Sequence, residues 1–133
     1  MSAPKNIQIK NEWDIVHARQ TGREMAKEIG FGQVDQARIA TAISELARNI
    51  YLYAKRGNII IDTYDKLGNK GIVVIAEDNG PGIPDIRRAM EDGFTTSGGL
   101  GAGLPGVKRL MDQFDIHSEV NKGTRIITHK FLR

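Results

Sequence analysis

The sequence has no cysteine, no long apolar run and no N-terminal signal segment. The absence of cysteine from the 133 residues excludes disulfide bonds and thiolate metal sites. The longest apolar run, 72–76, is far shorter than the roughly 20 residues that a membrane-spanning helix needs. The first residues also lack the apolar stretch of a secretion signal. We therefore expect a cytoplasmic protein that has no membrane partner.

The sequence also has little excess of positive or negative charge. The formal net charge is +3, and the lysines and arginines are spread along the chain instead of forming a cluster. Because so dilute a charge gives no argument for nucleic-acid binding, we predict no nucleic-acid partner. The histidines, His17, His117 and His129, are isolated and lack the spacing of metal ligands, so we interpret them as surface or packing residues.

Glycine, by contrast, is concentrated in one segment. Of the 15 glycines, eight lie between Gly80 and Gly106. A long flexible loop would explain this composition, but such loops are uncommon inside compact domains and are usually functional. Since the length fits one domain, we expect residues 1–133 to form a single unit in which this segment carries function.

The spacing of apolar residues predicts helices and strands in a fixed order. We expect an edge strand, two helices, a hairpin, two more helices and a second hairpin, at 6–10, 12–30, 35–54, 58–78, 83–92, 101–114 and 114–132. Asp35 is the expected N-cap of the second helix, and the Gly68-Asn69 pair is the expected turn of the first hairpin. This order predicts an α+β two-layer sandwich, with the helices on one face of a mixed, mostly antiparallel sheet.

The glycine-rich patterns of familiar nucleotide-binding proteins are matched only in part. The segment "GAGLPG" (101–106) fits the G-x-G-x-x-G pattern, but no strand precedes it, so it is not the dinucleotide fingerprint of a βαβ unit. No G-K-[ST] follows these glycines, which excludes a P-loop. The V-A-I-K, H-R-D and D-F-G motifs of eukaryotic-type protein kinases are absent as well.

Two polar residues lie four positions apart in the second predicted helix, in the segment "SELARN". Glu45 and Asn49 therefore share one helical face. A carboxylate here can accept a proton, and an amide oxygen can ligate Mg²⁺. A solvated helix face is the alternative interpretation of this pair taken alone.

Two further segments carry chemistry. The first, "DNGPG", places Asp78 at the end of a strand, before Gly80 and Gly82. A carboxylate there can accept the exocyclic N–H of adenine, and the glycines allow a base to lie against the backbone. The second, "TTSGGLGAGL" (95–104), leads into a helix, where successive backbone N–H groups and hydroxyls can bind phosphates. A plain turn and a flexible loop are the alternatives for these two segments.

The order of these motifs resembles the N, G1 and G2 boxes of the GHKL ATPase/kinase superfamily, whose architecture is the Bergerat fold. "KGTRIIT" (122–128) is similar to the closing G-T element of that superfamily, and the resemblance covers essentially the whole chain. Within the superfamily, the segments "AISELARNIYLYA", "DNGPGIPD" and "TTSGGLGAGLPGVKRLMD" look most like the small anti-sigma-factor-type serine/threonine kinases, and among them the stressosome switch kinases.

The resemblance implies a site for ATP and Mg²⁺. Glu45 would be the general base for the incoming hydroxyl, Asn49 would bind Mg²⁺ and Asp78 would recognise adenine. The implied nucleotide-binding residues are Asn49, Asp78, Gly80, Gly82, Ser97, Gly98, Gly99, Leu100, Gly101, Ala102, Gly103, Leu104 and Thr124.

One position departs from the related histidine kinases, which often carry a basic residue where this chain has Tyr53. The negative charge of the phosphates must then be met elsewhere. The candidate cations are Arg48, Lys55, Lys108 and Arg109.

The resemblance also implies a function. We expect an ATP-dependent protein serine/threonine kinase that transfers the γ-phosphate to a serine or threonine of a STAS-domain scaffold or antagonist protein. Such an enzyme would regulate a stress-signalling pathway by partner switching, and the released kinase would activate a PP2C-type phosphatase. The alternative is a nucleotide-gated anti-sigma factor, a binding module that acts by sequestration.

Overall fold

The computed structural model describes residues 3–83, 86–91 and 103–133. The elements in these ranges are, in chain order, β1 (Lys5–Ile9), α1 (Glu12–Ile29), α2 (Gln33–Tyr53), β2 (Gly57–Lys66), β3 (Asn69–Asp78), α3 (Ile86–Ala89), α4 (Gly103–Leu110), β4 (Gln113–Glu119) and β5 (Gly123–Leu132). The predicted order of helices and strands is confirmed. Within the described ranges, no helix is both long and apolar enough to cross a lipid bilayer.

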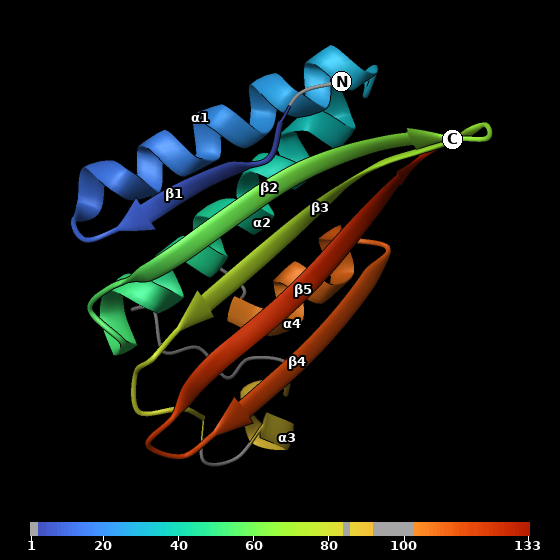
Figure 1. Cartoon of the computed structure of the whole chain (residues 1–133). Helices are drawn as coiled ribbons and strands as arrows, with labels where there is room; N and C mark the ends of the chain where they lie inside the picture. Colours follow the sequence, from blue (N-terminus) through green and yellow to red (C-terminus); the bar gives the residue numbers. More distant parts are fainter. Residues whose placement is uncertain (1–2, 84–85, 92–102) are drawn as a thin grey trace.

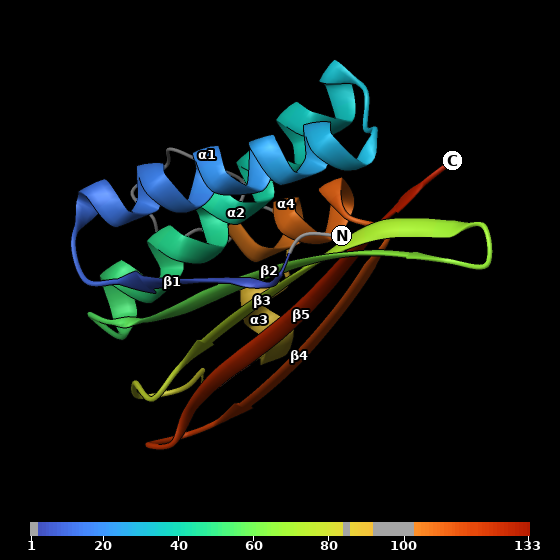
Figure 2. The same cartoon turned by 45° about the horizontal axis from the view of Figure 1, so that its top comes forward.

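A five-stranded sheet forms one layer, and α1, α2 and α4 cover one of its faces (Figures 1 and 2). The strand order is β1-β2-β3-β5-β4, and each neighbouring pair is antiparallel. The predicted α+β two-layer class is confirmed. The parallel pairing that a mixed sheet would contain does not occur among the described strands, since hairpins join β2 to β3 and β4 to β5, and the connection through α4 brings β5 back against β3.

The hydrophobic core lies between the sheet and the helices. Alternate residues of the central strands turn toward the helices, so that Ile59, Ile61 and Val74 are fully buried. Burying each such side chain stabilises the fold by about 1.5–3 kcal/mol. Gly22 allows α1 to approach α2 closely, because a Cβ at this position would collide with the side chain of Ile43. This packing fixes α2, which carries two predicted site residues, over the sheet.

The two long helices begin differently. Asn11 caps α1: its side chain accepts the Asp14 N–H, and the Asp14 carboxylate accepts the Asn11 N–H, which is a capping box. The prediction that Asp35 is the N-cap of the second helix is wrong, since Gly32 occupies that position. Asp35 lies instead in the first turn of α2, where the helix dipole favours a carboxylate.

The turn between β2 and β3 lies one residue earlier than expected. Leu67 and Gly68 have positive φ angles of 53° and 82°, as the central residues of a type I′ hairpin turn require. The predicted antiparallel hairpin across 66–71 is therefore confirmed, with Gly68 in its turn, whereas Asn69 already belongs to β3.

The helix expected at 101–114 is also shorter in the structure. α4 ends at Leu110, because the backbone N–H of Asp112 bonds to the His129 carbonyl of β5 at 2.8 Å and draws the chain into the sheet. Phe114, expected on this helix, lies in β4.

Candidate functional site

β3 ends at Asp78, where one end of the predicted site lies. Because side chains alternate along a strand, Asp78 lies on the same face as the buried Val74 and Ala76, toward the helices. Thr124, the threonine predicted near adenine, is paired with Asp78 in the register of β3 and β5, and it is buried. The structure therefore brings these two predicted residues together from distant segments.

Asp78 is a partly buried hydrogen-bond acceptor. Its Oδ1 accepts the Gly80 backbone N–H at 2.9 Å. Burial raises the pKa of Asp78, and the backbone N–H groups of Gly80 and Thr124 oppose this rise. A carboxylate that is incompletely solvated gains from a further N–H donor. The exocyclic amino group of adenine is a donor of this kind.

Both predicted glycines of the loop after β3 make contacts that a side chain would prevent. A Cβ on Gly80 would lie 2.6 Å from the Cβ of Ala54, at the C-terminal end of α2. Gly82 has a φ of 78°, and its backbone packs against the Glu119 carbonyl. The loop is thus held between the end of α2 and the β4–β5 turn, and it presents backbone beside Asp78.

Sequence reasoning missed two residues that shape this end of the site. A Cβ on Gly123 would collide with the backbone oxygen of Asp78, so only glycine lets β5 approach the strand end this closely. The Ser118 Oγ lies 2.8 Å from Thr124 Oγ1 and accepts the Ile83 N–H at 2.7 Å. Gly123 stands in the "KGT" element and was within reach of the motif argument, whereas no sequence pattern singles out Ser118.

Glu45 and Asn49 lie on a half-buried flank of α2, and neither makes a side-chain hydrogen bond or ion pair with another described residue. The end of α2 meets Gly80 through Ala54. With a rise of about 1.5 Å per residue, Asn49 lies about 7.5 Å and Glu45 about 13.5 Å from Ala54 along the helix axis. From the Asp78 end, the site therefore presents a carboxylate, then an amide, then a second carboxylate.

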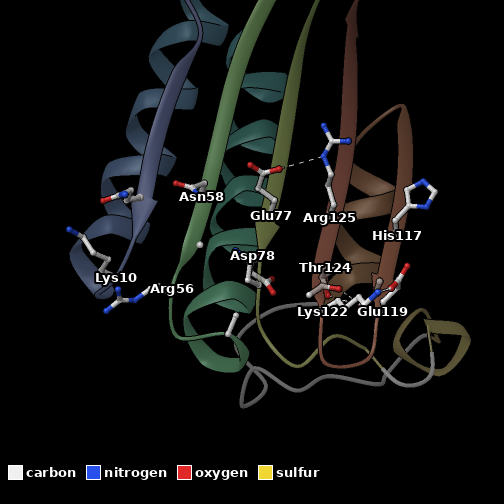
Figure 3. A pocket seen from close by; sticks show the side chains of 16 residues that line it. Lys10, Arg56, Asn58, Glu77, Asp78, His117, Glu119, Lys122, Thr124 and Arg125 are labelled. Atoms are coloured by element: carbon white, nitrogen blue, oxygen red, sulfur yellow. Dashed lines mark hydrogen bonds and ion pairs between the residues drawn. The ribbon is translucent and has the colours of Figure 1, made fainter.

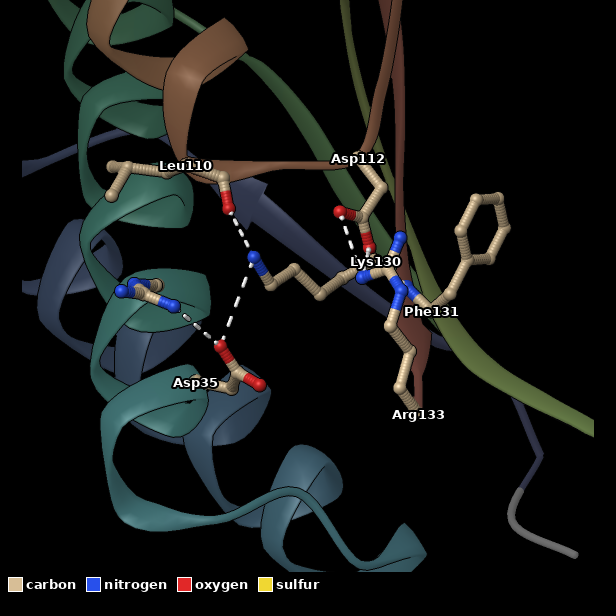
Figure 4. Close-up of polar contacts among 7 residues, drawn as sticks. Asp35, Leu110, Asp112, Lys130, Phe131 and Arg133 are labelled. Carbon is tan, nitrogen blue, oxygen red and sulfur yellow. Dashed lines mark hydrogen bonds and ion pairs between the residues drawn. The ribbon is translucent and has the colours of Figure 1, made fainter.

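α4 runs in roughly the opposite direction to α2 (Figures 1 and 2). At the other end of α4, Lys130 Nζ donates to the Leu110 carbonyl at 2.7 Å and lies 3.8 Å from Asp35 Oδ1 (Figure 4). The end of α4 therefore lies beside the start of α2. Gly103 lies about 10.5 Å back along α4, which brings it within about one helical turn of Glu45 along the axis.

Most of the predicted phosphate-binding segment lies outside the described residues. These positions are Ser97, Gly98, Gly99, Leu100, Gly101 and Ala102. Gly103 begins α4 with a φ of 65°. Leu104 is buried in the core, so that only its backbone can face a ligand.

The candidate cations for the phosphates are placed unequally. Lys108 and Arg109 stand in the last turn of α4, at the end away from Gly103. Lys55 follows the C-cap of α2 and is exposed. Arg48 is half-buried on α2, three residues after Glu45.

A pocket of about 970 Å³ opens beside the end of β3, with much of its wall on the helix-free face of the sheet (Figure 3). Its walls include Asn58, Glu77 and Arg125, and the Arg125 Nε lies 3.5 Å from Glu77 Oε2. Asp78 and Thr124 line it as well, whereas Glu45 and Asn49 do not. The pocket therefore adjoins the strand end where Asp78 and Thr124 meet, and it does not extend to the two predicted polar residues of α2.

The site combines an aspartate at a strand end, a loop with glycines and two helices that pack over an antiparallel sheet. This combination is typical of a class of nucleotide-binding proteins. Residues 34–133 match the family described as Histidine kinase-, DNA gyrase B-, and HSP90-like ATPase. The chain therefore belongs to this family of ATPases.

Among individual proteins, the Serine/threonine-protein kinase RsbT of Bacillus subtilis (strain 168) is 67% identical over 127 residues, which are 96% of this chain and 96% of that protein. The Anti-sigma F factor of Clostridium novyi (strain NT) is 34% identical over 100 residues, which are 71% of this chain and 70% of that protein. The family match and the identity to RsbT confirm that the chain is a nucleotide-binding protein serine/threonine kinase.

Solved structures share the fold. The RsbU and RsbW domains of Rv1364c from Mycobacterium tuberculosis give a TM-score of 0.65 at 22% identity, covering 99% of this chain and 33% of that longer chain. The catalytic domain of the histidine kinase ThkA gives a TM-score of 0.53 at 18% identity, covering 96% of this chain and 95% of that one. At such identities the likeness establishes the fold alone.

Proposed function

We propose that residues 1–133 form a single ATP-binding kinase domain that phosphorylates a STAS-domain scaffold or antagonist protein in the cytoplasm. The modification would switch partners in a stress-signalling pathway. The identity to the kinase RsbT and the similarity to anti-sigma F factors support a role among such regulators. In the same proposal, the kinase activates a PP2C-type phosphatase once its STAS-domain partner releases it.

The observation that carries the proposed site is the order of groups along α2. Asp78, in β3, lies beside the C-terminal end of α2. Measured along the helix axis from Ala54 at that end, Asn49 lies at about 7.5 Å and Glu45 at about 13.5 Å. An extended nucleotide with its adenine at Asp78 would place its phosphates beside Asn49 and its terminal phosphate near Glu45. This is the order that transfer to a hydroxyl held at Glu45 requires.

Positioning and charge stabilisation are most of what phosphoryl transfer needs from a protein. In this proposal Asp78 accepts the adenine amino group, while Gly80 and Gly82 leave room for the base. Glu45 accepts the proton of the substrate hydroxyl as that oxygen attacks the terminal phosphorus, while the bond from this phosphorus to the β–γ bridging oxygen breaks and ADP leaves. The backbone around Gly103 donates to the phosphates at the start of α4.

Asn49 would hold Mg²⁺ together with the phosphates. No group of three or more His, Cys, Asp or Glu side chains in the described part of the chain could hold a metal ion by itself. An amide oxygen, phosphate oxygens and water nevertheless suit Mg²⁺, which commonly binds with few protein ligands. When bound, the ion would neutralise charge on the phosphates.

The test is phosphoryl transfer to a purified STAS-domain protein. After incubation with this chain and Mg-ATP, mass spectrometry should find a phosphoryl group on a serine or threonine of the STAS-domain protein, and none when ATP is omitted. ATP consumption without any modified STAS-domain protein would contradict the proposed substrate.

A second function, sequestration of a sigma factor, is favoured by the 34% identity to an anti-sigma F factor. A pull-down of sigma factors with the chain in ATP and in ADP separates the two functions. We expect no nucleotide-dependent retention of a sigma factor. Stable retention together with the absence of phosphoryl transfer would replace the kinase-switch proposal by the sequestration one.

A further inference from the structure

Lys130 occupies a place that an apolar side chain would fill. It lies in β5 on the face that also carries Ile126 and Thr128, and it is 7% exposed. Burying an ammonium group costs free energy unless the group is paired and hydrogen-bonded. The contacts of Lys130 with the Leu110 carbonyl, at 2.7 Å, and the Asp35 carboxylate, at 3.8 Å, offset that cost (Figure 4).

These contacts join the end of α4 to the start of α2. The last carbonyls of a helix lack intrahelical partners and carry partial negative charge, so a cation at Leu110 is favourable. Interdigitating apolar side chains already favour particular registers between two packed helices. A hydrogen bond of 2.7 Å adds a directional restraint, because it weakens steeply with distance and angle. Lys130 holds the end of α4 by this bond and links it to the start of α2 by the 3.8 Å contact with Asp35, so it contributes to the register of α4 along α2.

Asp112, which lies next to this contact, has a different structural role. Its Oδ2 accepts the Phe131 N–H at 2.7 Å, and Arg133 lies 3.3 Å away. Burial acts to raise the pKa of Asp112, but the Phe131 bond and the charges of Arg133 and Lys130 lower it overall. These contacts hold the chain after α4 to the sheet, whereas Lys130 also reaches α2.

We propose that Lys130 is a positioning residue for the nucleotide phosphates. This inference rests on the proposed function, in which α2 carries Glu45 and Asn49 and α4 begins at the phosphates with Gly103. The register of the two helices sets the distance between these groups. Lys130 touches no reacting atom and acts through α4, so its loss weakens the binding of phosphates and leaves the binding of the base at Asp78 unchanged.

The test compares two ligands, ADP with Mg²⁺ and adenosine, by isothermal titration calorimetry. In Lys130→Met the affinity for ADP should fall about tenfold, while the affinity for adenosine stays at the wild-type value. Lys130→Arg keeps a donor and should restore most of the ADP affinity. Lys70→Met is the matched control, because Lys70 also lies 3.8 Å from an aspartate, Asp65, but is 46% exposed; it should change neither affinity.

An unchanged ADP affinity in folded Lys130→Met would overturn the inference, and so would an equal loss of ADP and adenosine affinity. If Lys130→Met does not fold, Asp35→Asn serves instead: it should lower ADP affinity about threefold without changing adenosine affinity, and no change would overturn the inference. A failure of the proposed function can be told apart from a failure of this inference by a second variant, Asp78→Asn. If Asp78→Asn still binds adenosine, the proposed function is contradicted, whatever the result for Lys130.

Discussion

Two regions of the molecule meet at Asp78 and Thr124. On the helix side, Glu45 and Asn49 lie on α2, whose C-terminal end meets the loop after Asp78 through Ala54 and Gly80. On the helix-free face, the pocket of about 970 Å³ is a more evident hollow than the surface along α2, and polar side chains line it as well.

The two regions differ in how their glutamates are paired. In the helix-free pocket, Glu77 pairs with Arg125 at 3.5 Å, and Glu119 pairs with Lys122 at 3.4 Å. On the helix side, Glu45 and Asn49 have no side-chain partner among the described residues. The comparison teaches that shape alone does not locate this site, because the predicted motif residues Glu45 and Asn49 lie outside the hollow.

The largest expected effect is on the transfer rate when Glu45 is replaced, and Glu77, the other half-buried glutamate, is the control. Glu45→Ala should lower the rate of transfer to a STAS-domain protein about 10²–10⁴-fold, because a general base contributes that much. Its affinity for ATP should stay close to that of the wild type. Glu77→Ala, on the other face, should change the rate by no more than about twofold. Quenched-flow assays would measure both rates, and a Glu45→Ala enzyme that transfers phosphate at the wild-type rate would remove Glu45 from the mechanism.

A similar pair of aspartates tests adenine recognition. Asp78→Asn should lower ATP affinity about a hundredfold, since a hydrogen bond to a charged acceptor is lost. Asp62 is also half-buried and accepts a local backbone N–H, from Thr63 at 2.9 Å; Asp62→Asn should leave affinity unchanged. Fluorescence titration with a labelled nucleotide measures both, and equal effects of the two changes would show that Asp78 has no special role.

Two asparagines test which residue binds Mg²⁺. Asn49→Ala should raise the Mg²⁺ concentration needed for half-maximal transfer by about tenfold or more, because it removes an oxygen ligand. Asn58→Ala, in the helix-free pocket, should not change it. A Mg²⁺ titration of the transfer rate makes the comparison, and identical curves for Asn49→Ala and the wild type would exclude Asn49 as a ligand.

The smallest expected effect is on stability as a function of pH. The pKa of Asp78 is raised in the folded chain, so the unfolded chain ionises at lower pH than the folded one. The free energy of unfolding should therefore lose a contribution as the pH rises from the ordinary carboxyl range through the raised pKa. Asp78→Asn lacks this loss, so in urea unfolding it should gain stability relative to the wild type between about pH 4 and neutral pH. A relative loss over that range would contradict the burial of Asp78.

Much of the fold followed from local patterns. Alternation in "NIQIK" and in the two hairpins marked the strands, and the apolar spacing from Ile39 to Ile50 marked α2. The errors concern where helices begin and end. Gly32, not Asp35, is the N-cap of α2, and the bond of the Asp112 N–H to the His129 carbonyl of β5 ends α4 before Phe114.

The candidate site was predictable where a motif carries its own chemistry, as at Asp78 and Glu45. It was not predictable where pairing between distant strands decides, as at Ser118, whose contact with Thr124 depends on the β4–β5 register. Lys130 had one sequence signal, since a period of two places it on the same face as Ile126. Its contact with Leu110 becomes visible only when α4 packs on α2.

The most direct test of the helix-side site is a crystal structure of the chain with Mg²⁺ and a non-hydrolysable ATP analogue. We expect the adenine amino group within hydrogen-bonding distance of the Asp78 carboxylate, and the phosphates beside Asn49 and Gly103. A nucleotide bound in the helix-free pocket, against Glu77 and Arg125, would contradict the site.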